Sequence, residues 1–321
     1  MQSIKKVAIL MGGQGPEAEI SRLSAEGIGN ALKQLNISYF FVELDDTWVE
    51  LLEAGQPDFV YIALHGSPGE DGTIQGFLEN MDLPYQGCGV SASALAIDKP
   101  KTKECLESIG VGVADGIVLS GEGLNVASNW VDFFHNKNRK IVVKPSACGS
   151  SVGVHIIQDV NEIPKAIADA AQYSPFVMLE EYISGQELVV VVLNGQAQGV
   201  MEIVPHKGAF YDYASKYQDG GSTHTYPANI SIEVEKRCLL WAEKTCDVTG
   251  CSGAVRVDFR YDARADKLIV MEINTLPGFT KVSLLPELMG HLGVSFPELV
   301  TWTIQDGLNQ YRERKSICKA A

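Results

Sequence analysis

Apolar runs and amphipathic segments alternate along the first third of the chain. The apolar runs predict strands over 6–11, 38–44 and 59–64, and the periodic segments predict helices over 18–35 and 73–81. This alternation is typical of a parallel sheet with crossover helices, whose ligands bind at the carboxyl ends of the strands. A glycine-rich segment at 11–15 and the His65-Gly66 turn both fall at such ends.

The pattern changes where a helix of small residues meets Asp98-Lys99-Pro100, which predicts a domain boundary near 96–100. The remaining apolar runs predict strands over 140–144, 152–157, 177–182, 188–193, 253–261 and 267–273, with helices over 160–172 and 231–249 and further helices at the end. The segment 205–227 is polar and aromatic, without clear periodicity. A connection of this length is usually a functional lid or a disordered segment.

Composition narrows the classes of protein. With 45% hydrophobic and 21% charged residues in 321, the chain is not disordered as a whole. A net charge of −14 argues against holding nucleic acid or anionic lipid by bulk charge, but not against a small anion held by a few placed cations. Scattered cysteines without paired CxxC motifs predict free thiols. With no signal peptide and no run of apolar residues long enough to span a membrane, we expect a soluble cytoplasmic protein.

A predicted hairpin over 255–274 carries the strongest chemical signal. Period-two alternation puts Arg256 and Asp258 on one face of the first strand, and Glu272 and Asn274 on one face of the second. Carboxylate and amide oxygens suit Mg²⁺, and two such ions can clamp the oxygens of a phosphoryl group in transfer. The alternative is an exposed sheet face with a paired arginine, which the tightly shaped continuation at 275–280 disfavours.

Two loops are candidates for binding a nucleotide. A strand ends at Lys144 and enters a loop of small residues, whose backbone amides can form an anion-binding nest. The chain has no Gly-Lys pair and therefore no Walker A loop. Taken alone, this segment fits a hairpin turn with a solvated lysine as well as it fits an anion-binding loop. In the segment 179–187, backbone groups could read adenine and Glu187 could accept from ribose hydroxyls. Taken alone, that segment reads better as an acidic hairpin.

The segment 13–18 matches the dinucleotide pattern G-x-G-x-x-A between a strand and a helix. The acid expected to hold the ribose would be Glu43, which lies further along the chain than usual. A tight turn closing the sheet is therefore favoured over NAD binding. Glu17 remains notable as a charge at a helix N-terminus, where the alternative is an acid that only complements the helix dipole.

Six motifs, taken together and in order, resemble those of the D-alanine–D-alanine ligases of the ATP-grasp superfamily. They are Gly12-Gly13 with Glu17 to Ser21, Ala63 to Gly72 including Gly69-Glu70-Asp71-Gly72, Asp98-Lys99, Lys144 to Gly153, Phe210 to Tyr217, and Glu272 to Thr280 with Ser283-Leu284. The resemblance covers nearly the whole chain. It implies an α/β fold with a Rossmann-like parallel-sheet domain followed by a two-subdomain ATP-grasp module.

The resemblance also implies a domain division and a reaction. The substrate-binding domain would span 1–97, the central subdomain with the phosphate loop and adenine site 98–204, and the C-terminal subdomain 205–321, with a lid at 205–227 and the metal site. ATP would phosphorylate the carboxylate of one D-alanine, and the amine of a second would attack the acyl phosphate. The product would be D-alanyl-D-alanine for peptidoglycan precursors.

Roles for individual residues follow from the same resemblance. Glu17 would bind the ammonium of the first D-alanine with His65 nearby, while Ser283 and Leu284 would position the second. Arg256 and the Gly278 amide would stabilise the oxyanion. A catalytic set of Glu17, Ser150 and Tyr217 would tie the glycine–serine loop to the lid, whose closure excludes water.

The resemblance implies ATP and two Mg²⁺ or Mn²⁺ ions as cofactors. It also implies a homodimer. The metal ligands would be Asp258, Glu272 and Asn274. The nucleotide would be bound by Lys99, Lys144, Gly149, Ser150, Ser151, Glu180, Glu181, Ile183, Glu187 and Lys216. The lid tyrosine, Tyr217, favours dipeptide over D-alanyl-D-lactate formation. Departures from the family pattern are Ala147-Cys148, Glu181 and Gln186.

Three other interpretations compete with this one. Another ATP-grasp ligase with a different amino acid is disfavoured by the set Glu17, His65 and Tyr217. An NAD-dependent oxidoreductase leaves the cluster of Asp258, Glu272 and Asn274 unexplained. A nucleotide-binding module without catalysis is disfavoured because every charged residue that the ligase chemistry needs is in place.

Overall fold

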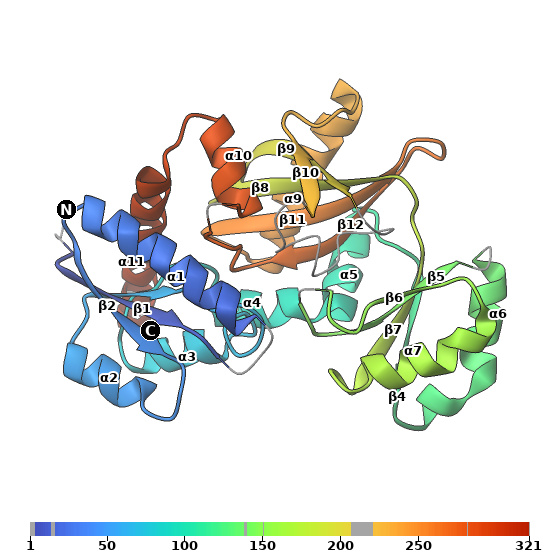
Figure 1. Cartoon of the computed structure of the whole chain (residues 1–321), viewed down its shortest axis with the longest axis horizontal. Coiled ribbons are helices and arrows are strands. Elements are labelled where there is room, and N and C mark those ends of the chain that lie inside the picture. Colours follow the sequence, from blue (N-terminus) through green and yellow to red (C-terminus); the bar gives the residue numbers. More distant parts are fainter. Residues whose placement is uncertain are drawn as a thin grey trace.

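The computed structural model describes residues 4–13, 17–137, 140–149, 151–206, 221–280 and 282–320. Within these residues the strands form three separate sheets, which Figure 1 shows side by side with the third sheet in the middle. The α/β class predicted from the alternation of elements is confirmed. Each sheet contributes one wall or rim of the site described below.

The first sheet is parallel, with strand order β2-β1-β3, as the sequence predicts. Its strands are β1 (Lys6–Met11), β2 (Ser38–Glu43) and β3 (Phe59–Ile62). The helices around it are α1 (Ala18–Gln34), α2 (Trp48–Gly55) and α3 (Thr73–Asn80), of which α2 was not predicted. Val7 to Leu10 are fully buried, which explains the continuous apolar run of β1.

The second sheet is antiparallel, with order β4-β7-β5-β6. Its elements are β4 (Gly116–Ser120), η1 (Gly121–Asn125), α6 (Ala127–Asn136), β5 (Ile141–Pro145), β6 (His155–Ile157), η2 (Val160–Glu162), α7 (Ile163–Ala170) and β7 (Phe176–Glu181). The predicted strand over 152–157 is shorter than expected. Ser151 and Gly153 have φ of +59° and +68°, so extended backbone begins only after them.

The third sheet has order β10-β9-β8-β11-β12. Its strands are β8 (Gln186–Leu193), β9 (Gln196–Pro205), β10 (Ser222–Thr225), β11 (Ala254–Asp262) and β12 (Lys267–Asn274). Strands β9 and β10 were not predicted. Strand β10 lies within the segment 205–227, so part of that segment has regular structure. The predicted boundary at 204/205 falls inside β9; strand pairing changes sheet between β7 and β8 instead.

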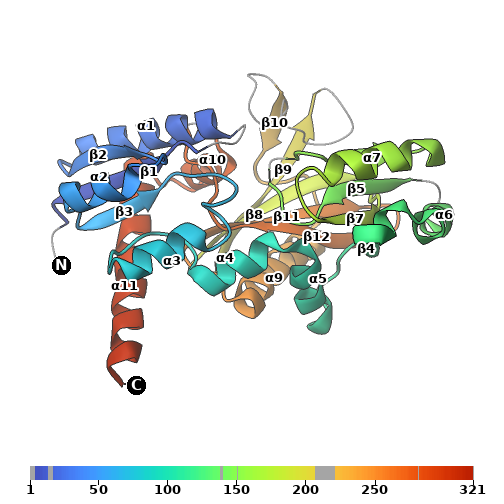
Figure 2. The same ribbon diagram turned by 90° about the horizontal axis from the view of Figure 1, so that it is seen from below.

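Helices connect and cover the three sheets. They are α4 (Val90–Ile97), α5 (Lys99–Ser108), α9 (Ile232–Thr249), α10 (Leu284–His291) and α11 (Phe296–Ala320). One buried cluster contains side chains of β1, β3 and α1 together with those of β8, β9, α10 and α11. The last helix therefore returns to the first sheet, beside which Figure 2 shows it, and fixes that sheet against the third.

Two further sequence expectations can be compared with the structure. No helix within the described ranges is both long enough and apolar enough to cross a bilayer. The cysteines whose side chains are described are free thiols, as predicted: Cys88, Cys105, Cys148, Cys238, Cys246 and Cys251.

Candidate active site

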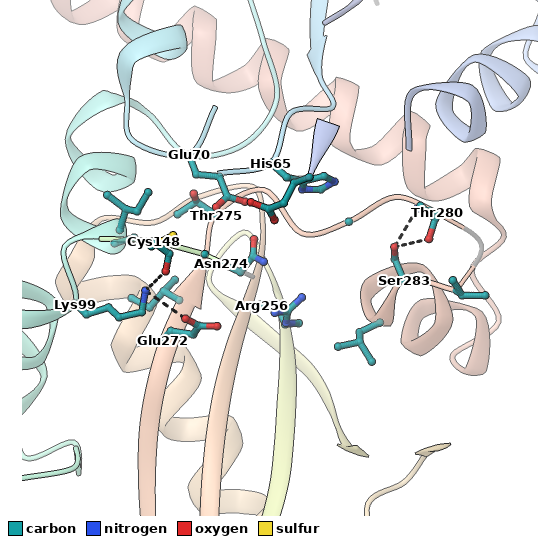
Figure 3. A pocket seen from close by; sticks show the side chains of 18 residues that line it. His65, Glu70, Lys99, Cys148, Arg256, Glu272, Asn274, Thr275, Thr280 and Ser283 are labelled. Carbon is teal, nitrogen blue, oxygen red and sulfur yellow. Dashed lines mark hydrogen bonds and ion pairs between the residues drawn. The ribbon is translucent and has the colours of Figure 1, made fainter. Parts of the chain in front are cut away.

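Two cavities meet where the three sheets face one another. The first is lined mainly by residues of the first and third sheets and of the segments that follow their strands, and the second mainly by residues of the second and third sheets. Lys99, Cys148 and Glu272 line both cavities. Figure 3 shows the first cavity, with Lys99 donating to the Cys148 carbonyl and facing Glu272. A molecule in either cavity therefore lies within reach of these three residues.

The hairpin of β11 and β12 brings the predicted metal ligands together. Arg256 pairs with Asn274 and Asp258 with Glu272 across the two strands, so all four lie on one face. Asp258 is 5% exposed and accepts two hydrogen bonds from Arg256, at 2.6 Å from Nε and 2.7 Å from Nη2. Glu272 lies 3.5 Å from Lys99 Nζ.

This donor set fits a hard divalent cation. Two carboxylates and the amide of Asn274 offer only oxygen ligands, which is what Mg²⁺ takes in proteins. Among the described residues no group of three or more His, Cys, Asp or Glu side chains could hold a metal ion. A site here would accordingly need the amide oxygen, and phosphate oxygens of a bound nucleotide as well.

The phosphate loop is anchored by Lys99. Its Nζ lies 2.7 Å from the Cys148 carbonyl oxygen, and its backbone N–H donates to the Ser146 carbonyl at 3.2 Å. Lys144, at the end of β5, forms an ion pair of 2.7 Å with Glu180 on β7. Ser151 lines the second cavity and Gly149 the first. Predicted phosphate ligands from three separate segments are thus gathered around one loop.

The far end of the second cavity suits a flat apolar group with a polar rim. Its walls are apolar and its rim carries acids; the lining includes Ala114, Val142, Ile156, Ile269 and Met271 with Glu180, Glu181, Ile183 and Glu187. Arg260, which the sequence did not single out, ties this rim together. Its Nη1 lies 3.2 Å from Glu187 Oε2, and its Nε donates to the Ile183 carbonyl at 3.2 Å.

Glu17 reaches the first cavity from the start of α1. A Cβ added to Gly66 would lie 2.8 Å from Glu17 Oε2, so a side chain there would displace this carboxylate, and the φ of +65° at Gly66 also favours glycine. A Cβ on Gly149 would lie 3.9 Å from the same oxygen. The structure therefore brings Glu17 next to the phosphate loop.

His65 lies across the first cavity from Lys99 (Figure 3). Its Nε2 is 3.3 Å from Ser24 Oγ, which also accepts from the Phe279 N–H at 3.4 Å. Burial, with a smaller contribution from Arg256, lowers the pKa of His65 to about 4. The imidazole is consequently neutral at physiological pH and can contribute hydrogen bonds but not charge.

Side-chain hydrogen bonds join Ser283 to Thr280 at the edge of the first cavity. Ser283 Oγ accepts from the Thr280 N–H at 3.0 Å and lies 2.8 Å from Thr280 Oγ1. A Cβ on Gly278 would lie 2.7 Å from Ser283 Oγ, so a side chain there would displace the serine. Gly278, Ser283 and Leu284 all line the first cavity. Thr280, which was given no role from the sequence, fixes the position of the Ser283 hydroxyl.

Glu70 is the acid that the sequence analysis left without a role. It lines the first cavity, and a Cβ on Gly149 would lie 3.8 Å from its Oε2. Burial and the nearby Glu17 and Glu272 raise the pKa of Glu70 to about 8. Glu70 lies in the same sequence motif as His65, which could have indicated that it belongs to the site. The charges that perturb it come from distant segments, which no local pattern reveals.

The raised pKa of Glu70 predicts a pH-dependent stability. Between pH 4.5, its ordinary value, and about 8, folded Glu70 keeps a proton that the unfolded chain has lost. The free energy of unfolding therefore falls as pH rises through this window. Thermal denaturation of the metal-free protein between pH 6.5 and 8 should show this slope, and Glu70→Gln should reduce it. Glu104→Gln, on the exposed side of α5, should keep it; an unchanged slope in Glu70→Gln would contradict the assignment.

Some predicted residues cannot be placed. Ser150, Lys216 and Tyr217, and most of the segment 205–227, lie outside the described residues. Glu43, the candidate ribose acid of a dinucleotide site, has a different partner. It forms an ion pair with Arg22 Nη2 at 2.5 Å and lies directly against Gly12.

Comparisons with known proteins find relatives along nearly the whole chain. The family model described as "D-ala D-ala ligase C-terminus" matches residues 106–305, and "D-ala D-ala ligase N-terminus" matches 46–88. The chain is 40% identical over 305 residues to the D-alanine–D-alanine ligase of Sinorhizobium fredii, covering 94% of this chain and 97% of the relative. It is 41% identical over 302 residues to that of Citrifermentans bemidjiense, covering 94% and 95%.

Solved structures show the same overall arrangement. The D-alanine–D-alanine ligase from Bacillus anthracis complexed with ATP has a TM-score of 0.83 and 27% identity, covering 97% of this chain and 100% of that one. The ligase from Coxiella burnetii also has a TM-score of 0.83 and 27% identity, covering 99% and 97%. The predicted ATP-grasp fold is thereby confirmed.

Proposed function

The chain belongs to the D-alanine–D-alanine ligase family, and we propose from this premise how its own residues carry out the reaction. The protein is an ATP-dependent ligase that joins two D-alanines to D-alanyl-D-alanine for peptidoglycan precursor synthesis. The observation that carries the assignment of roles is the meeting of two cavities at Lys99, Cys148 and Glu272. One cavity suits the amino acids and the other suits ATP.

In the second cavity, the apolar walls would hold the base of ATP and Glu187 would accept from the ribose. Glu180, Glu181 and Ile183 complete the rim. Lys99 and Lys144 would then neutralise the phosphates, which the backbone of Gly149 and Ser151 would also contact. We assign Ser150 and Lys216 to the same task from the sequence alone.

Asp258, Glu272 and Asn274 would hold two Mg²⁺ or Mn²⁺ ions at the junction of the cavities. When bound, such ions neutralise charge on the transferring phosphoryl group. The chain's own contribution is a set of oxygens on two paired strands, in which Asp258 is buried and Glu272 and Asn274 are half-buried. Lys99, which donates to the Cys148 carbonyl and faces Glu272, links the phosphate loop to these metal ligands.

In the first cavity, Glu17 would bind the ammonium group of the first D-alanine, with His65 beside it as a neutral partner. Arg256 and the Gly278 N–H would stabilise the oxyanion that develops when the second amine attacks. Ser283 and Leu284 would position the second D-alanine. Tyr217 and Ser150 would connect Glu17 to the lid and exclude water that would hydrolyse the acyl phosphate.

Three broader proposals accompany these roles. We divide the chain into an N-terminal substrate domain over 1–97 and two ATP-grasp subdomains, with their boundary moved to the β7–β8 connection because strand pairing changes there. The use of ATP supports a cytoplasmic location. The family resemblance supports a homodimer, which sedimentation of the purified protein would test.

The second substrate provides a direct test of specificity. With D-alanine alone, the enzyme should release ADP and form the dipeptide, whereas L-alanine should support neither. Because Tyr217 is present, adding D-lactate should produce no D-alanyl-D-lactate and no additional ADP. ADP release coupled to product analysis by mass spectrometry measures all three outcomes. ADP release that rises with D-lactate but not with a second D-alanine would contradict the role of Tyr217.

A further inference from the structure

A second buried lysine lies behind the nucleotide cavity. Lys103 is on α5, one helical turn after Lys99, so both side chains project from the same face of the helix. Lys103 is 8% exposed, and it does not line either cavity of the active site. A lysine this buried is rarely found without a partner.

The partner of Lys103 is Glu180. Lys103 Nζ donates to Glu180 Oε1, while Lys144 Nζ lies 2.7 Å from Glu180 Oε2. Glu180 is 5% exposed, so one buried carboxylate holds two ammonium groups, one on each oxygen. Of the three residues, Lys144 and Glu180 line the nucleotide cavity.

The charges of this cluster do not cancel. Burial lowers the pKa of Lys103 to about 8, against the opposing effect of Glu180, so Lys103 still carries its charge at neutral pH. Two lysines that share one carboxylate therefore leave one net positive charge beside the cavity. Burial alone would raise the pKa of Glu180, but Lys144 and Lys103 lower it to about 2, so the carboxylate is ionised at every physiological pH. If Lys103 were absent, Glu180 would fully neutralise Lys144 and hold it away from an anionic ligand.

We propose that Lys103 is a positioning residue for ATP: by sharing Glu180, it leaves Lys144 with uncompensated positive charge for the nucleotide phosphates and fixes the Glu180 carboxylate at the rim of the cavity. The inference rests on the proposed placement of ATP in the second cavity. Lys103 touches no substrate in this arrangement and acts through Glu180. Its effect should therefore fall on ATP binding and not on D-alanine binding.

Steady-state kinetics of Lys103→Met test this proposal. We expect the KM for ATP to rise about tenfold, because one charge–charge interaction in a buried cluster is lost. The KM for D-alanine and kcat should stay within about twofold. Lys103→Arg should recover most of the ATP affinity, since it restores the charge and the hydrogen bond to Glu180. The matched control is Lys101→Met, an exposed lysine on the same helix that pairs with Asp98.

The results separate this inference from the placement of ATP. Lys144→Met should raise the KM for ATP by itself, and Lys103→Met should have a smaller effect in that background. An unchanged KM for ATP in Lys103→Met, with a large effect of Lys144→Met, would overturn the inference alone. A drop in thermal stability with equal changes in both KM values would also overturn it, in favour of a structural role. No effect of either lysine would overturn the placement of ATP as well.

Discussion

Replacing Glu272 by glutamine is expected to lower D-alanine-dependent ADP release by about 100-fold or more, equivalent to at least about 2.7 kcal/mol of transition-state stabilisation. Glu272 lines both cavities, faces Asp258 across the hairpin and lies 3.5 Å from Lys99 Nζ. Glutamine keeps the shape of the side chain and removes the charge that a divalent cation requires. The loss should therefore be chemical, with the fold retained.

Two measurements make this prediction specific to the metal. The concentration of Mg²⁺ needed for half-maximal activity should rise in Glu272→Gln, and thermal denaturation should show a folded protein. Glu104→Gln removes an exposed glutamate from α5 and should leave ADP release unchanged. Full activity of Glu272→Gln at ordinary Mg²⁺ concentrations would show that Glu272 is not a metal ligand.

Local periodicity predicted most of the fold because buried strands and amphipathic helices leave direct patterns. The apolar run of β1 and the period of α1 are examples. Strand β10 left no such pattern, since its sequence Ser222–Thr225 is entirely polar. It is a strand because it pairs with β9, in a register that joins Ser222 to Pro205. Such pairing depends on distant residues and cannot be derived from the segment alone.

In the candidate site, too, local patterns predicted some features, whereas others depend on residues far apart in the sequence. Period two predicted that Asp258 shares a face with Arg256, but only the register of β11 and β12 places Asp258 opposite Glu272. Lys103 was missed for a related reason. On a polar helix, lysines four residues apart resemble a solvated face, and the carboxylate that buries Lys103 comes from β7. Residues that act through partners from other segments were the ones the sequence did not reveal.

Positive charge in the site is held in place by carboxylates that the reaction also needs. Lys99 faces Glu272, Lys144 and Lys103 share Glu180, and Arg256 binds Asp258 through two hydrogen bonds. A chain with a net charge of −14 can therefore present several cations to a polyanion. Net charge describes the solvated surface, whereas this pairing determines the field inside the cavities.

Arg256→Lys is expected to lower kcat by about 100-fold, because losing one donor of an oxyanion site typically costs about 10²–10³ in kcat. Arg256 is 9% exposed and donates to both oxygens of Asp258. Lysine retains the charge but has no planar fork, so it cannot bind Asp258 through two bonds and also face the oxyanion. Methionine would be a poorer choice, since an unpaired buried Asp258 would destabilise the fold by about 3–5 kcal/mol.

The KM for D-alanine distinguishes the two tasks that Arg256 could have. A fall in kcat with little change in KM indicates an interaction made only in the transition state, whereas a rise in KM alone indicates binding of the ground state. The matched control is Arg264→Lys in the exposed turn of the same hairpin, which should keep wild-type kinetics. A folded Arg256→Lys enzyme with kcat within twofold of wild type would mean that the oxyanion is stabilised elsewhere, leaving the Gly278 N–H as the group to test next.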